Sequence, residues 1–548
     1  MAADLALSAP TKTGRSPRTL IARYSAKRAL RSAVLWGYVF GIAVASSAIS
    51  YGRIYKTPAE RQRLAESFGS NHAASALFGP APQLQTVAGF TAFKVSMTVM
   101  IVGALWGLFT ATRLLRGDED AGRWELLTSG QTTGGRAVSQ VLAGLGTAAV
   151  ALWAITALVI AVAGRSSSVR IGIGPGLYLA LALVAGAVIF LGVGAVTSQL
   201  APSRRQAAAY GGAFLGVSYG LRMVGDAGTG LHWLVWASPL GWVEQLRPLT
   251  GPRPWALLPI GGFVIALCLL AVGLAGRRDV GASIWPARTA RAPRLLELTG
   301  PASLALRLAG PSVIGWTVAV AVAGLLMGIV ANAAGTTILG SSVQQVFTRL
   351  GARGSGTDAF LGVAFLIIAI VIAFEAASLL SAAEAEEADG RLDHLLVGTV
   401  GRSRWLVERL CVCVAALLVS GITAGFFVWV GAATQGSGVS LANVLDAGIN
   451  VVAPAIFLLG VGAFSLGAWP RRTITVSYLV LGWSALIVLT GGFFAQNHWV
   501  LDTSLFHQMA AAPAVAPDWQ TNGVLGGLGL IAMILGGRAL EHRDVQGH

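Results

Sequence analysis

The sequence contains little charge. Of its 548 residues, 11% are Asp, Glu, Lys or Arg, whereas 55% are hydrophobic, and the mean hydropathy is +0.69. Soluble domains carry charge on about a quarter of their residues. The composition therefore excludes a soluble globular domain as the bulk of the chain and predicts a protein embedded in lipid.

Residues and motifs that support chemistry are scarce as well. The three cysteines, Cys268, Cys411 and Cys413, lie in apolar stretches, which excludes a disulfide framework. The seven histidines show no metal-ligand spacing such as H-E-x-x-H, so we expect neither a metal site nor catalytic residues. The P-loop pattern G-x-x-x-x-G-K-[ST] is absent, and we expect this chain to bind no ATP and no other cofactor.

Long uncharged runs are abundant. Many reach the roughly 18 residues that a helix needs to cross a bilayer core of about 30 Å. Continuous apolar runs exclude a β-barrel, whose strands alternate. We therefore expect an all-α integral membrane protein with about twelve transmembrane helices. The predicted spans are 33–50, 95–115, 137–163, 174–198, 206–224, 255–275, 312–334, 359–381, 406–432, 443–466, 473–493 and 523–540.

The net charge of +15 is concentrated in two stretches, the segment before the first predicted span and the linker before the seventh. If the spans alternate in direction, both stretches lie on one side, and the positive-inside rule places them and both termini in the cytoplasm. The first 32 residues lack the apolar core of a signal peptide and are expected to form a basic amphipathic helix. We interpret the charge as a topology signal and expect no nucleic-acid binding.

Repeated landmarks indicate an internal duplication. "LGVGA" occurs at 191–195 and at 459–463, and "RRDV" at 277–280 is matched by "HRDV" at 542–545. Matches in the same order at nearly constant spacing mark a repeat. Six spans per repeat make the two halves parallel. The predicted organisation is a connecting helix over 1–32, a first permease half over 33–280, a linker with a second connecting helix over 281–311, and a second half over 312–548.

A charged cassette follows the second predicted span of each half: "GDEDAGRWELLTSG" at 117–130 and "EEADGRLDHLLVG" at 386–398. We expect residues 118–129 to form a short cytoplasmic helix with its acids in the first turn and with Trp124 and its neighbouring leucines as an apolar ridge. Such a helix suits docking into a groove on a cytosolic partner. The alternative is a solvated loop that only sets topology, but such a loop needs no shared Glu-x-x-Gly-Arg spacing.

The two cassettes, "PSRR" at 202–205 and "SPLGWVEQLRPL" at 238–249 carry a family resemblance. The chain resembles the permease subunit of ABC-2-class exporters, specifically the fused twelve-span branch that exports polyketide antibiotics such as tetronasin. The resemblance covers essentially the whole chain. The second half departs from it, because "LFHQMAAAPAVAPDW" at 505–519 replaces the Ser-Pro-Leu-Gly-Trp stretch.

The resemblance implies an exporter in the bacterial plasma membrane, surrounded by lipid, that moves hydrophobic or amphipathic compounds such as drugs and polyketide antibiotics. Two copies of a separate cytosolic P-loop ATPase would bind ATP and Mg and hydrolyse the ATP. The helix after the second span of each half would be the coupling helix that rests on this ATPase. The implied coupling residues are Glu119, Gly122, Arg123, Trp124, Glu125, Glu387, Gly390, Arg391 and Asp393.

Three ionisable residues in or near the predicted spans, Lys94, Arg222 and Glu375, are further candidates, because charge inside a membrane is costly. They lie near predicted span ends, where we expect them to act as anchors that reach the interface; the alternative is a place on the pathway or in an interhelix pair. A proton-driven twelve-span drug transporter is a second function class, although only Glu375 approaches the mid-membrane carboxylate it needs. A membrane-embedded lipid or glycan transferase would need an acidic cluster, and the sequence has none.

Overall fold

The computed structural model describes residues 19–69, 72–128, 133–166, 169, 171–227, 230–279, 281–285, 300–337, 356–388, 390–397, 401–490 and 498–543. Most of these residues are helical and none of them forms a strand, which confirms the all-α prediction. The chain divides into two compact units, called here the first and second half. The first comprises Met1–Ala65, Phe78–Gly225 and His232–Arg291, and the second Glu66–Leu77, Asp226–Leu231 and Ala292–His548.

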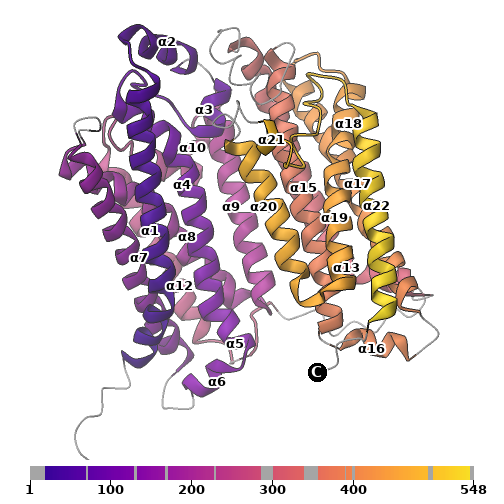
Figure 1. The fold of residues 1–548 in the computed structure, drawn as a ribbon. Helices are drawn as coiled ribbons and strands as arrows, with labels where there is room; N and C mark the ends of the chain where they lie inside the picture. The colour runs from indigo at the N-terminus through magenta and orange to yellow at the C-terminus, as the bar shows by residue number, and fades with distance from the viewer. Residues whose placement is uncertain are drawn as a thin grey trace, which may run out of the picture. The chain divides into compact units, whose positions relative to one another are not determined.

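Helices up to α12 precede the linker. They are α1 (Leu20–Ile54), α2 (Pro58–Gly69), α3 (His72–Phe78), α4 (Val87–Thr112), the π-helix η2 (Arg113–Gly117), α5 (Asp118–Asp120), α6 (Arg123–Thr128), α7 (Gly134–Gly164), α8 (Ile173–Leu200), α9 (Arg204–Asp226), α10 (Leu234–Ala237), α11 (Pro239–Glu244), the 3-10 helix η3 (Pro254–Ala256) and α12 (Leu257–Ala275). Figure 1 shows the long helices of this half running side by side.

The same kind of bundle follows the linker. Its elements are α13 (Pro301–Thr337), α15 (Gly356–Ala388), α16 (Arg391–Leu396), α17 (Arg402–Thr434), α18 (Leu441–Asn450), α19 (Val452–Ala468), the 3-10 helix η5 (Pro470–Arg472), α20 (Thr473–Thr490), α21 (His498–Leu501) and α22 (Trp519–His542). In Figure 1, α5 and α6 lie at one end of the first half and α16 at one end of the second; we call this the cassette end of each half.

Ten helical segments in the described residues are long and apolar enough to cross a membrane, which confirms a multi-pass membrane protein. They coincide with ten of the predicted spans. Helices α9 and α20 occupy the fifth and eleventh predicted positions but are not among the ten. In α9, glycines, tyrosines and Arg222 dilute the apolar residues. The count of twelve therefore stays a prediction.

Three boundaries differ from the predicted ones. Helix α1 runs unbroken from Leu20 to Ile54, so the expected connecting helix and the first span are one element. Helix α13 likewise continues across the predicted boundary at residue 312 and contains Pro311. The predicted span 443–466 is confirmed as one of the ten, Leu441–Ala468, but it consists of two consecutive helices, α18 and α19, that meet at Val451. Pro454, in the first turn of α19, cannot donate a backbone hydrogen bond there.

Small residues bring the first and third long helices of each half close together. A methyl group at Gly41 of α1 would lie 2.5 Å from Cβ of Val159 in α7. In the second half, a methyl at Gly328 of α13 would lie 2.2 Å from the carbonyl oxygen of Val428 in α17. Such contacts are the usual means of packing helices in lipid. The second long helix of each half, α4 or α15, leads into the cassette.

Candidate functional site

Both cassettes turn sharply at their glycine. Gly122 and Gly390 each have φ of +69°, a left-handed conformation that glycine adopts without the strain a side chain would add. The predicted continuous helix over residues 118–129 is therefore wrong, because α5 ends before this turn and α6 begins after it. The acids belong to the end of the preceding helix, and only the residues after the glycine form the protruding short helix.

The glutamate that both cassettes share, Glu119 in the first half, is an internal anchor. The carboxylate of Glu119 accepts hydrogen bonds of 2.6 and 2.7 Å from the guanidinium of Arg278, which follows α12, and one of 2.7 Å from the backbone N–H of Gly281. Arg278 also donates from Nε to Gln199 at the end of α8, at 2.9 Å. Glu119 and Arg278 are both buried, so this pair ties the cassette to α8 and to the segment after α12.

The second half repeats this anchor. The guanidinium of Arg543, after α22, lies 2.7 Å from the carboxylate of Glu387. Its Nε donates to the carbonyl of Gly467 at 3.0 Å, the position 268 residues after Gln199, and another nitrogen donates to the carbonyl of Leu466. The structure thus joins two landmarks that the sequence repeats separately, the cassette glutamate and the arginine of "RRDV" and "HRDV". The opposite charges of these landmarks, 159 residues apart in the first half and 156 in the second, were the signal that could have predicted the pairing.

A further acid in each half holds the start of the fifth long helix. In the first half, Asp120 accepts a hydrogen bond of 2.8 Å from the backbone N–H of Arg204, at the start of α9, and pairs with Arg116 at 3.1 Å. In the second half, Glu384 accepts one of 3.1 Å from the N–H of Ile474 near the start of α20. Glu384 occupies the position equivalent to Arg116, so in the second half this contact is made by a residue that precedes the cassette.

The exposed charged residues of the predicted coupling set lie beyond the glycine turns. Glu125, Arg391 and Asp393 are exposed, and the side chain of Arg123 is 44% exposed although it donates to the buried Asp118 at 2.6 Å. These four charges are the part of the predicted coupling set that a partner protein can reach. Glu119 and Glu387, the buried glutamates of that set, face into their own half instead.

The apolar residue after each arginine is buried rather than exposed. Trp124 is 4% exposed and packs into the core of the first half, and its counterpart Leu392 is 1% exposed. The indole of Trp124 therefore does not form part of the predicted exposed docking ridge, but packs α6 against the bundle. The leucine side chains predicted beside it lie outside the described part.

Arg222 is an interhelix partner and not an anchor at the interface. It is completely buried in α9, where its guanidinium lies 3.0 Å from the carboxylate of Glu244 at the end of α11 and 5.0 Å from the ring centre of Tyr219. Sequence reasoning missed Glu244, which lies in a loop between predicted spans. A buried arginine requires such a partner, since an uncompensated buried charge is strongly destabilising.

Glu375 and Lys94 differ from each other in environment. Glu375 is fully buried in the interior of α15, so it is not at a span end as predicted. Neither of its carboxylate oxygens makes a geometrically acceptable hydrogen bond to a described residue, and the hydroxyl of Ser420 is the polar group near it. Lys94 is exposed near the start of α4, where its ammonium lies 5.5 Å from the ring centre of Phe90, which fits the predicted anchor.

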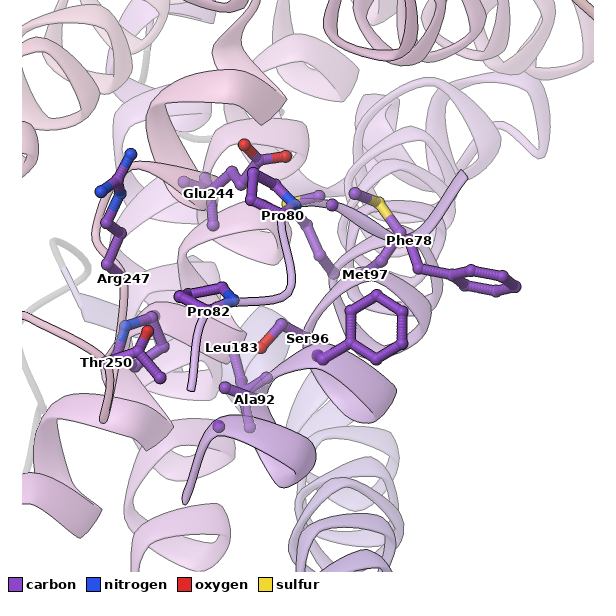
Figure 2. A pocket seen from close by; sticks show the side chains of 17 residues that line it. Phe78, Pro80, Pro82, Ala92, Ser96, Met97, Leu183, Glu244, Arg247 and Thr250 are labelled. Carbon is purple, nitrogen blue, oxygen red and sulfur yellow. The ribbon is translucent and has the colours of Figure 1, made fainter. Parts of the chain in front are cut away.

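A cavity of about 70 Å³ lies beside the Arg222–Glu244 pair, away from the cassette end. Figure 2 shows its lining, with Glu244 and Arg247 on one side and apolar side chains of α4 and α8, such as Met97 and Leu183, on the other. Pockets for drug-sized ligands usually measure about 300–1,000 Å³. This cavity is therefore too small to hold such a ligand.

Comparison with known proteins gives two matches that span nearly the whole chain. The family described as "Multidrug efflux system permease Rv1217c, C-terminal domain" matches residues 26–278 and 298–540, one segment on each side of the linker. The multidrug efflux system permease protein Rv1217c of Mycobacterium tuberculosis (strain ATCC 25618 / H37Rv) is 33% identical over 530 residues. This match covers 93% of this chain and 92% of the relative.

Proposed function

Because this chain belongs to the family of the multidrug efflux permease Rv1217c, we propose that it is the permease subunit of an ATP-driven exporter of the ABC-2 class, in the tetronasin-type branch. Two copies of a cytosolic P-loop ATPase hydrolyse ATP, and the permease moves hydrophobic or amphipathic compounds, including drugs and polyketide antibiotics, out of the cell. In this proposal the protein lies in the bacterial plasma membrane with both termini in the cytoplasm, so the cassette end of each half is cytoplasmic.

The observation that carries the proposal is the anchored cassette. In each half a short helix with exposed charges stands beyond a glycine turn, while the acids before the turn bind the segment after the sixth long helix, through Arg278 or Arg543, and the start of the fifth. A push on the exposed helix therefore reaches the second, fifth and sixth long helices together. A loop that only set topology would need none of these buried contacts.

The exposed charges are the proposed docking surface. Reversing a charge in a protein–protein contact weakens docking, whereas the same change on a free surface alters stability by about 0.5 kcal/mol or less. Glu125 and Asp393 occupy matching exposed positions in the two cassettes, and neither forms an ion pair with a described residue. They are therefore better probes than Arg123, which also supports Asp118.

The test is co-purification with the candidate ATPase and ATP-driven efflux from proteoliposomes. We expect Glu125→Arg combined with Asp393→Arg to keep normal abundance but to lose the ATPase and efflux. Arg165→Glu, an exposed charge at the opposite end of the first half, is the matched control and should keep both. Normal ATPase association and normal efflux in the double variant would contradict the proposal.

One observation favours a second candidate, a proton-driven drug transporter. Glu375 is the kind of enclosed carboxyl that such a mechanism requires, because it is fully buried inside α15. In the first half the equivalent position is Gly107, so the feature is not repeated. Efflux that persists without ATP and collapses with a proton uncoupler would favour this candidate.

A further inference from the structure

The ends of the two halves opposite the cassettes share a local architecture that the sequence conceals. In the first half the hydroxyl of Ser238 donates to the carbonyl of Ser218 at 2.6 Å, and in the second the hydroxyl of Ser504 donates to the carbonyl of Ser484 at 2.9 Å. Both members of each pair are 266 positions from their counterparts. The repeat thus continues through the loop in which the Ser-Pro-Leu-Gly-Trp motif is missing.

A second matching contact fixes the same register. The indole N–H of Trp242 donates to the carbonyl of Trp236 at 2.7 Å. At the positions 266 residues further on, the amide of Gln508 donates to the carbonyl of Asp502 at 3.2 Å. The backbone is held in the same way in both halves, but two large aromatic side chains in the first half are replaced by Asp502 and Gln508 in the second.

Aromatic rings fill this corner of the first half. Trp242 packs edge-on against Phe263 of α12, with ring centres 5.5 Å apart, and Phe263 stacks on Phe214 of α9 at 6.3 Å. Trp236 stacks on Trp255 at 5.0 Å. Such aromatic clusters contribute stability beyond the apolar area they bury.

The described residues leave the same corner of the second half open. Gln508 replaces Trp242, Val480 replaces Phe214 at the same 266-residue spacing, and Leu528 replaces Phe263 at the 265-residue spacing of "RRDV" and "HRDV". A cavity of about 540 Å³ is found here. Its lining is Phe457, Leu479, Val480, Trp483, Ser484, Asp502, Thr503, Ser504, Leu505, Gln508, Leu525 and Leu528. This volume lies within the range of about 300–1,000 Å³ that drug-sized ligands occupy.

We propose that this cavity of the second half binds compounds that combine a planar aromatic group with a cationic substituent. The aromatic group takes the space that the side chains of Trp242 and Phe263 fill in the first half, and the cation faces the carboxylate of Asp502. This inference rests on the proposed function, since it names a binding site for the exported compounds and the chemical class that the site accepts.

The lining supports both parts of this ligand. Its walls are mostly aliphatic, and the ring of Trp483 is held in place because its indole N–H donates to the hydroxyl of Thr503 at 2.9 Å. Asp502 is the acid in the lining, which contains no lysine or arginine, and its side chain is 55% exposed. His507 lies 3.9 Å from this carboxylate and forms an ion pair with it only when its imidazole is protonated.

Refilling the cavity with the residues of the first half tests the proposal. The probe is ethidium, a planar aromatic cation, and its binding to the purified full-length protein is followed by fluorescence without ATP. We expect Gln508→Trp with Leu528→Phe to weaken ethidium binding at least about tenfold, which corresponds to 1.4 kcal/mol. The reciprocal control, Trp242→Gln with Phe263→Leu, opens the first half and should leave the original binding intact.

The charge is tested separately. Asp502→Asn should weaken binding of ethidium but not of Nile red, a neutral planar aromatic dye. Thermal melting and size-exclusion profiles matching those of the wild type would show that the refilled variant is folded. Unchanged ethidium binding in a folded refilled variant would overturn the proposal. So would a refilled variant that loses only co-purifying phospholipid, because the cavity would then be a lipid site. If ethidium binds at this cavity but is not exported in an ATP-driven manner, the binding-site proposal stands and the proposed function is contradicted instead.

Discussion

Glu119 and Arg278 lie 159 positions apart in the sequence, yet two short charge-assisted hydrogen bonds join them inside the first half. Glu387 and Arg543 form the corresponding pair in the second half. Each pair connects a cassette to the segment that follows the sixth long helix of its half. Glu119 and Glu387 are therefore structural anchors, whereas the charged residues beyond the glycine turns are exposed.

Removing one member of the first anchor should destabilise the protein. Breaking a buried ion pair costs about 3–5 kcal/mol, because the remaining charge stays buried without its partner. We expect Glu119→Gln to lower the melting temperature of the purified protein markedly, and Glu387→Gln to act in the same way. Glu125→Gln, an exposed glutamate in the same cassette, is the control and should change little. Equal melting temperatures for Glu119→Gln and Glu125→Gln would refute the anchor.

The Arg222–Glu244 pair can be tested by introducing the residues that occupy the equivalent positions of the second half. At the 266-residue spacing, the equivalent residues are Val488 and Ala510, so the second half lacks this pair. We expect Arg222→Val alone and Glu244→Ala alone each to reduce stability, since each leaves a buried charge behind. The double variant should be more stable than Glu244→Ala. A double-mutant cycle of melting temperatures measures the coupling, and strictly additive effects would argue against the pair.

A substitution at Glu375 distinguishes transport driven by ATP from transport driven by protons. An enclosed carboxyl is costly to ionise, and Glu375→Gln preserves its size while removing the exchangeable proton. If ATP drives transport, this variant should retain ATP-dependent efflux in proteoliposomes. Glu375→Ala, which leaves a hole in the bundle, controls for packing and should mainly lower stability. Loss of efflux in a stable Glu375→Gln protein would support proton coupling instead.

The orientation in the membrane is tested by labelling. In a background without Cys268, Cys411 and Cys413, single cysteines replace Ala121 in the first cassette and Ser440 before α18; both positions are exposed. An impermeant thiol reagent added to intact cells should modify Ser440→Cys and not Ala121→Cys. After the cells are broken, the reagent should also modify Ala121→Cys. The reverse pattern would contradict cytoplasmic cassettes, and labelling of both sites in intact cells would contradict the topology.

Sequence patterns predicted where the cassettes lie in the chain, but they did not predict which of their side chains are exposed. The macrodipole argument placed the acids at the start of an exposed helix, whereas Asp118 and Glu119 end the preceding one and are buried. The spacing of the apolar residues predicted an exposed docking ridge. Trp124 does make apolar contacts, but it makes them with the core of its own half. Neither pattern contains the position of Arg278, which decides which way the acids face.

Sequence patterns alone predict a helical membrane protein with an internal duplication and a charged cassette in each half. These properties follow from local hydrophobic runs and from repeated short motifs, which need no knowledge of distant contacts. The tertiary structure adds that Glu119 and Glu387 are anchors, that Arg222 pairs with Glu244, and that aromatic rings fill one corner of the first half that the described residues leave open in the second. Each of these depends on side chains from separate helices, whose meeting is set by packing and not by spacing along the chain.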